Sequence, residues 1–540
     1  MKKLKSLLPL MLAAVVLFSS CDLIELLTEE ENLKPQETFD KTLTIDIPEE
    51  YDKKETFLIF TNTGEGESYI GRNASKRSAA SGNKRMTVYK GVTNMGGGYY
   101  RDEVVFNKNY KEDYSRAAGS SGNNNQTYRD LDDNKFFACV DENINFEEQS
   151  FTKKYDRDHC RIWYWGNTPF VKSSDVSDDA FSDLGDKINS VFLEETEIFG
   201  SNAYNYSDRE IVADENTKLD ILVYDLFGDA SSGQQSGTFG FFYSNDFRLD
   251  SNYSNKCEAI HIDSYFLKVD IEDDAQRVTS TIVHEFQHLL NHCNKNPKRL
   301  DSDVWYNEML SMCAEDIFQN IIGTSDDDSP KSRFNGSFNE PYQGFVYWPD
   351  ASDEDIFNAY GNAYAFGAYL MRNYGGVNLI HQMATNNWVN EESVTQALKA
   401  VGKNKDFMTV MKDFGYVYLL DNRNSITLNK KINQYFNETK YILEAIDLNK
   451  YYFPTYNSRK ELENDISNLY IKGEPQVGSN EYGTLYGLYG PRIFRTSYKL
   501  TKPIRQYGFA VYYLGKVYSD EPVEIPNPGN NIEYQIVTFE

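Results

Sequence analysis

The sequence has little cysteine and little histidine for its length. Six of each are spread over 540 residues, and no CxxC occurs. The absence of CxxC excludes zinc ribbons and thioredoxin-type redox motifs. With Cys21 set aside, the other cysteines are odd in number and have no short repeated spacing, so a disulfide framework is not indicated.

Positive charge and long apolar runs are also scarce. Lys and Arg number 55 against 82 Asp and Glu, which gives a formal net charge of −27. Such a chain repels nucleic acid and anionic lipid headgroups, so a nucleic-acid partner is not expected. Beyond the N-terminus, no stretch approaches the roughly 20 apolar residues that span a bilayer. We therefore expect an anchored or secreted protein.

The N-terminus has the features of an export signal. Three lysines lie within the first five residues, the apolar run "LLPLMLAAVVLF" covers residues 7–18, and "SSC" follows. This order is typical of a secretory signal, and small residues before Cys21 resemble a bacterial lipobox. The resemblance implies a lipid on Cys21, which would be the sole membrane contact, and a location at the cell envelope or cell surface. Plain secretion is the alternative.

The length of the chain and the changes in residue pattern along it predict several domains. We expect a signal peptide over residues 1–20 and an acidic tether over 21–42. Short β-rich segments separated by Gly, Asn and Ser predict a β-sandwich-like domain over 43–160. Helical patterns dominate a further domain over 161–448, and β-strand patterns predict a C-terminal β domain over 449–540.

The middle region contains strands and amphipathic helices. Apolar residues at three- and four-residue steps predict a helix over 177–200, capped by "SDD". Two strands are expected at 219–226 and 259–267, and further helices at 305–322 and 358–376.

The segment "VHEFQH" carries the strongest chemical signal. On a helix, His284 and His288 stand one turn apart on the same face, so both imidazoles can bind one ion. Glu285 lies beside them, within reach of a metal-bound water. Zinc favours imidazole and carboxylate ligands, and a catalytic zinc keeps one position open for water. A third ligand is still required.

The spacing after the motif excludes one source of that ligand. A metzincin would have Gly and His where this chain has Asn291 and Asn294. His292 lies one further turn along the helix axis, about 6 Å beyond His288, and is not expected to join the same ion. It is expected to be a polar residue near the helix C-terminus.

A second helical segment offers Glu308, within "WYNEMLSMCAED". The HExxH motif with a downstream "NE" pair resembles the gluzincin metallopeptidases. This resemblance implies one zinc ion bound by His284, His288 and Glu308, with Glu285 as general base. It also implies a multidomain protein with an α+β, thermolysin-like core, here flanked by N- and C-terminal β-rich domains.

Residues 160 to 445 resemble most closely the hyicolysin family of secreted neutral metallopeptidases, through the two motifs and "YGNAYAFGAYLMRNYGG". The resemblance implies a tyrosine that donates to the oxyanion, at Tyr360 or alternatively Tyr364. Glu315 and Asp316, two turns into the second helix, are positioned to orient a ligand histidine.

These observations predict a secreted or surface-anchored zinc endopeptidase that acts on extracellular proteins or peptides. A zinc aminopeptidase and a surface adhesin or binding lipoprotein built on a metallopeptidase-like scaffold are the alternatives. Calcium is a further cation to consider. The acidic clusters "SDDDS" and "DASDED" lack EF-hand spacing, however, and are expected to be solvated loops.

Overall fold

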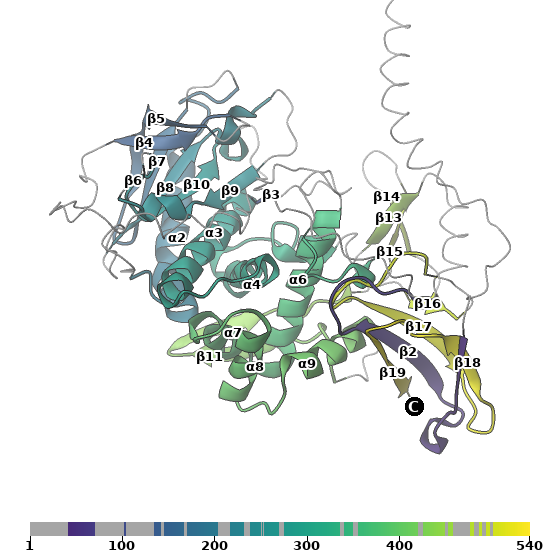
Figure 1. Cartoon of the computed structure of the whole chain (residues 1–540). Coiled ribbons are helices and arrows are strands. Elements are labelled where there is room, and N and C mark those ends of the chain that lie inside the picture. The colour runs from purple at the N-terminus through teal and green to yellow at the C-terminus, as the bar shows by residue number, and fades with distance from the viewer. Residues whose placement is uncertain are drawn as a thin grey trace, which may run out of the picture.

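The computed structural model describes the parts of the chain that contain the motifs (Figure 1). Cys21, the export signal and the tether lie outside them. Within these residues, no helix combines the length and apolar character needed to cross a membrane. The described residues are 42–70, 102–103, 134–141, 145–166, 170–203, 217–231, 238–249, 251, 253–268, 275–334, 340–348, 355–419, 425–448, 452–456, 476–479, 485–488, 493–496 and 500–539.

A six-stranded sheet is the framework of the first part of the molecule. Its order is β3 (Asp102–Glu103), β9 (Thr238–Phe242), β10 (Ala259–Asp263), β8 (Leu219–Tyr224), β7 (Cys160–Trp165) and β6 (Thr152–Asp156). The three central strands β10, β8 and β7 are parallel, whereas β9 runs antiparallel to β10 and β6 antiparallel to β7. Both strands predicted before the histidine motif are therefore central strands.

Side chains of the central strands alternate between two apolar layers. Every residue of β8 and β10 is buried, as expected for strands covered on both faces. Ile221 and Val223 belong to the main core, with α2 and α3, while Leu222 and Tyr224 pack with the hairpin β4 (Lys135–Cys139) and β5 (Phe146–Ser150). Figure 1 shows the hairpin and the two helices on opposite sides of the sheet.

Helices form the rest of this body. Helix α2 (Asp178–Phe199) begins after Ser177, whose side chain accepts a hydrogen bond from the Ala180 N–H, so the predicted cap is confirmed. The other helices, in chain order, are α3 (Ala275–Lys295), α4 (Val304–Ile322), α6 (Asp355–Leu370), α7 (Gly376–Thr385), α8 (Asn390–Ala400) and α9 (Phe407–Phe414). A π-helical turn, Met371–Gly375, joins α6 to α7.

The terminal β segments pair with each other. In a four-stranded sheet, β2 (Glu55–Asn62) lies between β17 (Phe509–Lys516) and β19 (Ile532–Phe539), with β16 (Ile493–Arg495) at the far side of β17. We predicted separate domains over 43–160 and 449–540, but β2 of the first shares this sheet with strands of the second. The strands β3 and β6 of the first belong instead to the six-stranded sheet. Similarly β1 (Thr42–Ile45) pairs with β18 (Val523–Pro526).

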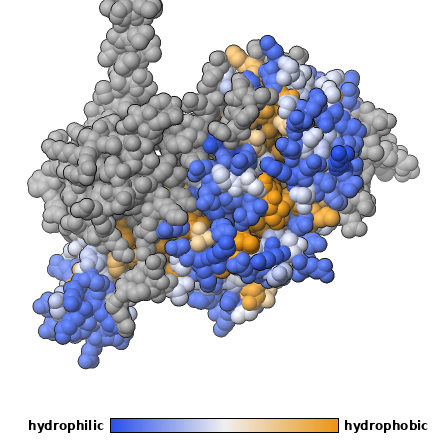
Figure 2. All heavy atoms as spheres, turned by 180° about the vertical axis from the view of Figure 1, so that it is seen from behind, coloured by the Kyte–Doolittle hydropathy of each residue, from blue (hydrophilic) through white to orange (hydrophobic). Residues whose placement is uncertain are grey.

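Three smaller strand groups complete the described structure. The pair β11 (Ile432–Phe436) and β12 (Thr439–Leu443) follows the helices. The strands β13 (Tyr452–Tyr456), β15 (Leu485–Leu488) and β14 (Gln476–Ser479) form a three-stranded sheet in that order. The described surface seen in Figure 2 is mainly hydrophilic, with hydrophobic residues gathered near its middle.

Candidate metal centre and active site

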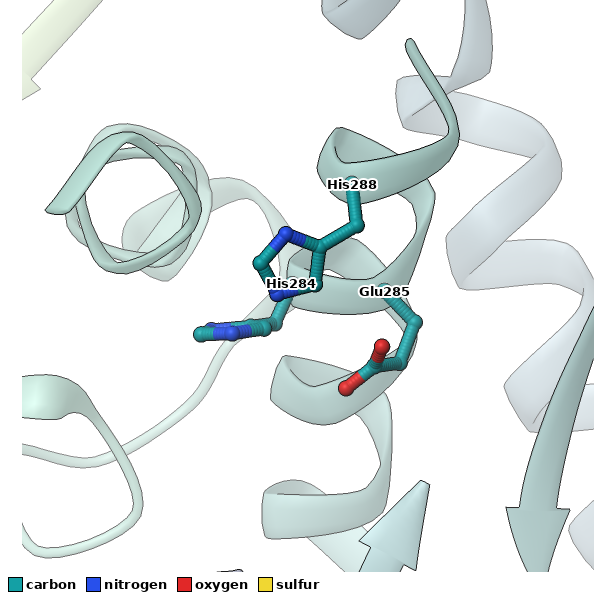
Figure 3. A group of neighbouring side chains, drawn as sticks. All are labelled: His284, Glu285 and His288. Carbon is teal, nitrogen blue, oxygen red and sulfur yellow. The ribbon is translucent and has the colours of Figure 1, made fainter. Parts of the chain in front are cut away.

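The HExxH motif lies inside α3, which packs against both the sheet and α4. The side chains of His284, Glu285 and His288 project from this one helix with the two imidazoles side by side (Figure 3). The ring centroids are 4.8 Å apart. One ligand atom from each of the three residues lies within 4.8 Å of the others, so the group is compact enough to hold a metal ion.

Glu308 from α4 faces the same point. Its Oε2 lies 3.1 Å from His284 Nε2 and 3.6 Å from His288 Nε2. The structure therefore brings together the two histidines and the carboxylate that the sequence assigned to one ion. All three side chains are buried, and His284 has 0% exposure.

Helix α4 also orients His284. Glu315 Oε1 lies 2.8 Å from His284 Nδ1, and the Ser280 hydroxyl donates to Glu315 Oε2. If Nδ1 carries the proton, it donates to Glu315 and the lone pair of Nε2 is directed toward Glu308. A carboxylate behind a histidine in this way is a common arrangement in zinc sites, because it fixes the tautomer and the ring orientation.

A second chain of polar groups lies behind His288. Ser311 Oγ is 3.1 Å from His288 Nδ1, and the Ser311 hydroxyl donates to Gln287 Oε1. This arrangement favours a proton on Nδ1, again leaving Nε2 on the side of Glu308. Ser280 and Ser311 were not predicted as site residues. Helical spacing could have identified both serines, because residues three or four apart on a helix share a face. Ser280 lies one turn before His284 on α3, and Ser311 lies three residues after Glu308 on α4.

The local electrostatics suit a cation. Burial alone would lower the pKa of His288, but the neighbouring Glu308 carboxylate outweighs it and raises the pKa above the ordinary value. Glu195 on α2 is also buried, and burial raises its pKa well above the ordinary range, which favours its neutral form. The negative charge near the histidines therefore comes from the carboxylates of α3 and α4.

The donor set fits zinc. Two imidazole nitrogens and one carboxylate oxygen converge from two packed helices, and the second nitrogen of each ring has its own hydrogen-bond partner. Three protein ligands are the number found in catalytic zinc sites, whereas structural sites use four. The fit to zinc thus rests on the three ligand atoms and on Glu315 and Ser311, which contact the second nitrogen of each imidazole.

Asp316 differs from its neighbour Glu315. Its carboxylate pairs with Arg372, with Oδ2 2.8 Å from Nη1, and both side chains are buried. Tyr364 donates to the same oxygen over 3.1 Å. Asp316 and Tyr364 thus form a structural group with Arg372, and the structure does not bring them together with the histidines in the way it brings Glu315.

Tyr360 lies one turn before Tyr364 on α6. Its ring is buried, with the Arg333 guanidinium 4.5 Å above its centroid and Trp348 packed edge-on at 4.7 Å. Of the two tyrosines predicted for the oxyanion, Tyr364 thus donates to Asp316, while Tyr360 packs between Arg333 and Trp348.

His292 stays apart from the ion-binding group. It packs against the rings of Phe242 and Phe247, with centroids 5.6 and 5.3 Å away. Burial lowers the pKa of His292 to about 4. This neutral, aromatic-packed histidine agrees with the expectation that it is not a third ligand.

Comparison with known proteins gives a family for this region. The sequence profile of the family described as Peptidase M30 matches residues 152–455, just over half of the chain. The "Neutral metalloprotease ShpI" of Staphylococcus hyicus is 29% identical over 196 residues, which cover 35% of this chain and 41% of the relative. The match therefore spans about two fifths of the length of that curated relative.

Proposed function

Because the chain belongs to the peptidase M30 family, we propose that it is a zinc metalloendopeptidase that hydrolyses peptide bonds of extracellular proteins. The observation that carries the proposal is the convergence of His284 Nε2 and His288 Nε2 on Glu308 Oε2, with Glu285 beside them. These are the residues that would hold zinc. When bound, zinc supplies Lewis-acid chemistry that polarises the scissile carbonyl and makes water a nucleophile near neutral pH.

Glu285 is the general base in this proposal. It shares α3 with both histidine ligands, so the helix fixes its distance from the reacting water. Its carboxylate takes the proton of the attacking water and passes it to the leaving amine. Because the side chain is buried, bulk water competes little for that proton.

Tyr360 is proposed to donate a hydrogen bond to the oxyanion. The loss of one such donor costs about 10²–10³-fold in kcat. Tyr360→Phe should therefore lower kcat with little change in KM. The matched variant Tyr364→Phe removes the bond to Asp316 instead and should lower thermal stability more than kcat. Peptide-cleavage kinetics and melting curves of both variants separate the two roles, and an unchanged kcat for Tyr360→Phe would exclude it.

An extended substrate is proposed to pair with β9. This strand runs antiparallel to β10 and pairs at its other edge with the two-residue strand β3, so a substrate strand would have to extend or replace the β3 pairing. Backbone pairing along a sheet edge recognises internal peptide segments and does not require a terminus, which favours an endopeptidase over an aminopeptidase. Cleavage of an N-terminally blocked peptide tests this preference.

The location of the protein is part of the proposal. The lipobox-like "SSC" supports a lipid on Cys21 and a place at the bacterial cell surface, with secretion as the alternative. Labelling cells with a fatty-acid probe, with Cys21→Ser as control, tests the anchor. Label retained by Cys21→Ser would exclude this residue as its site.

The first experiment compares the mature chain with its Glu285→Gln variant, using casein or a fluorogenic peptide together with zinc content. We expect about one zinc per chain in both proteins and a rate loss of about 10²–10⁴-fold in the variant. Equal rates would overturn the role of Glu285. Absence of zinc from both would favour a binding lipoprotein on a metallopeptidase-like scaffold.

A further inference from the structure

A second group of acidic residues lies at the carboxyl ends of two central strands. Asp225 directly follows β8, Asp263 ends β10, and Asp229 follows the short helical turn Leu226–Gly228. A carboxylate oxygen from each lies within 4.8 Å of the other two. Because β8 and β10 are adjacent and parallel, the sheet itself brings two of these side chains together.

The backbone holds this group in place. Asp225 Oδ1 accepts from the Ala230 N–H over 3.1 Å, which closes the loop that carries Asp229. Phe227 and Gly228 both adopt left-handed backbone with φ near 59°, and this turns the chain back toward β10.

Asp263 is the most deeply buried member of the group and has an unsatisfied oxygen. It has 0% exposure, its Oδ1 accepts from the Tyr265 N–H over 2.7 Å, and its Oδ2 has no hydrogen-bond partner within the described part of the chain. Burial, followed by the charges of Asp225 and Asp229, raises the pKa of Asp263 well above the ordinary range. A buried carboxylate oxygen without a donor is costly unless a proton or a cation satisfies it.

We propose that Asp225, Asp229 and Asp263 bind a calcium ion that is separate from the catalytic zinc. The three residues offer only oxygen, the ligand of hard cations, and lack the imidazole or thiolate that zinc prefers. Magnesium usually keeps several waters and uses one or two carboxylates, whereas calcium accepts several carboxylates with little water. Two of these side chains are buried, which favours calcium.

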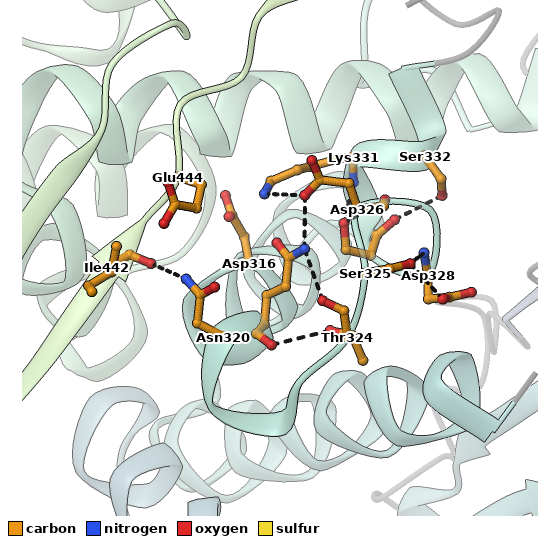
Figure 4. Close-up of polar contacts among 12 residues, drawn as sticks. Asp316, Asn320, Thr324, Ser325, Asp326, Asp328, Lys331, Ser332, Ile442 and Glu444 are labelled. Atoms are coloured by element: carbon orange, nitrogen blue, oxygen red, sulfur yellow. Dashed lines mark hydrogen bonds and ion pairs between the residues drawn. The ribbon is translucent and has the colours of Figure 1, made fainter.

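The acidic loop "SDDDS" provides a contrast (Figure 4). Asp326 Oδ1 pairs with Lys331 over 2.8 Å and accepts from Gln319, while Asp328 pairs with Arg277 over 2.8 Å. The carboxylates of Asp326 and Asp328 are thus bound by neighbouring side chains. The other cluster, "DASDED", lies outside the described residues except for Asp355.

A bound calcium would join β8 to β10 next to the helical turn η5 (Tyr265–Leu267), which packs against α3. The ion would therefore stabilise the carboxyl ends of two central strands of the sheet that supports the HExxH helix. This inference does not rest on the proposed peptidase activity, because its readouts are binding and stability.

The test uses the mature chain freed of calcium, with zinc kept constant, and measures calcium binding by isothermal titration calorimetry and melting by calorimetry. Wild type should bind one calcium and melt about 5 °C higher at saturation. Asp263→Asn should bind at least tenfold more weakly and lose the shift. Without calcium it should be at least as stable as wild type, since an uncharged side chain of the same size replaces the buried carboxyl group.

Two further variants keep the test decisive. Asp229→Asn, at a less buried position, should also lose the calcium shift even if Asp263→Asn fails to fold. Asp327→Asn, an exposed charge change in the "SDDDS" loop, should keep it. The proposal fails if wild type shows no calcium shift, if the Asp229 and Asp263 variants keep it, or if magnesium or zinc produces it and calcium does not.

Discussion

Glu315 and Asp316 are adjacent on α4 and yet have different partners, His284 and Arg372 respectively. Successive residues on a helix are about 100° apart, so one carboxylate faces α3 and the other faces α6 and the π-helical turn. Both are buried acids. Their different surroundings give them different expected roles, although the sequence presents them as one pair.

This difference can be measured with matched variants. Glu315→Gln should weaken zinc binding by about 10–100-fold, because the histidine loses its charged partner. Asp316→Asn should leave zinc affinity nearly unchanged and cost about 3–5 kcal/mol of unfolding free energy, because Arg372 is left as a buried charge with a weaker partner. Zinc titration with a chelator and urea denaturation measure the two effects, and equal zinc affinities for wild type and Glu315→Gln would contradict the first.

His292 makes folding sensitive to acid. Its pKa falls from 6.5 to about 4 on folding, so the unfolded chain binds more protons between these values and stability is lost as the pH drops through this window. The loss amounts to about 3 kcal/mol. Urea denaturation at pH 7 and pH 4.5 should show a smaller decrease for His292→Gln than for wild type. Parallel decreases would mean that His292 already titrates normally in the folded protein.

At the scale of elements, the approach of α3 to β9 places the motif against the sheet. A Cβ built at Gly240 on β9 would lie 2.8 Å from Ile262 Cδ1 and 2.9 Å from Thr281 Cγ2. Only a residue without a side chain allows the helix to lie this close. The same strand therefore supports the ligand helix directly.

Gly240→Ala tests this packing. The added methyl group should cost about 1–3 kcal/mol of unfolding free energy through overpacking. Thr281→Ser removes the methyl group that it meets on α3, so the double variant should recover part of that loss. A double-mutant cycle by urea denaturation gives the coupling energy, and a value near zero would show that the two residues do not interact.

At the scale of the whole molecule, the terminal sheet and the helical body share a core. Phe57 and Ile59 on β2 belong to the same apolar cluster as α3 and α4, whereas Leu58 and Phe60 face a second cluster with the C-terminal strands. A Cβ at Gly415, after α9, would lie 2.6 Å from Ile59 Cγ2. The two parts are thus in direct contact.

We therefore expect the terminal sheet to stabilise the metal centre. Ile59→Ala should cost about 2–5 kcal/mol and Ile59→Val about 0.5–1.5 kcal/mol. Because the core is shared, the temperature of zinc release should fall in the same order as the melting temperature. A zinc-sensitive dye follows zinc release, and circular dichroism follows melting. A zinc-release temperature unchanged by both substitutions would indicate independent domains.

The sequence by itself determined the features that depend on short-range periodicity. The spacing of His284 and His288 needs only the 3.6-residue helical repeat, and Ser177 caps α2 through a contact three residues away. The two central strands were likewise predicted from their own short segments, residues 219–226 and 259–267. Such patterns are local, so they can be recognised without knowledge of the fold.

Only the tertiary structure decided which distant groups meet. It placed Glu315 behind His284, Asp316 on Arg372, and β2 between two strands from the opposite end of the chain. It also joined Asp263 to Asp225 and Asp229 across two parallel strands. These contacts depend on how elements pack and on strand order, and neither is encoded in the spacing of residues along one element.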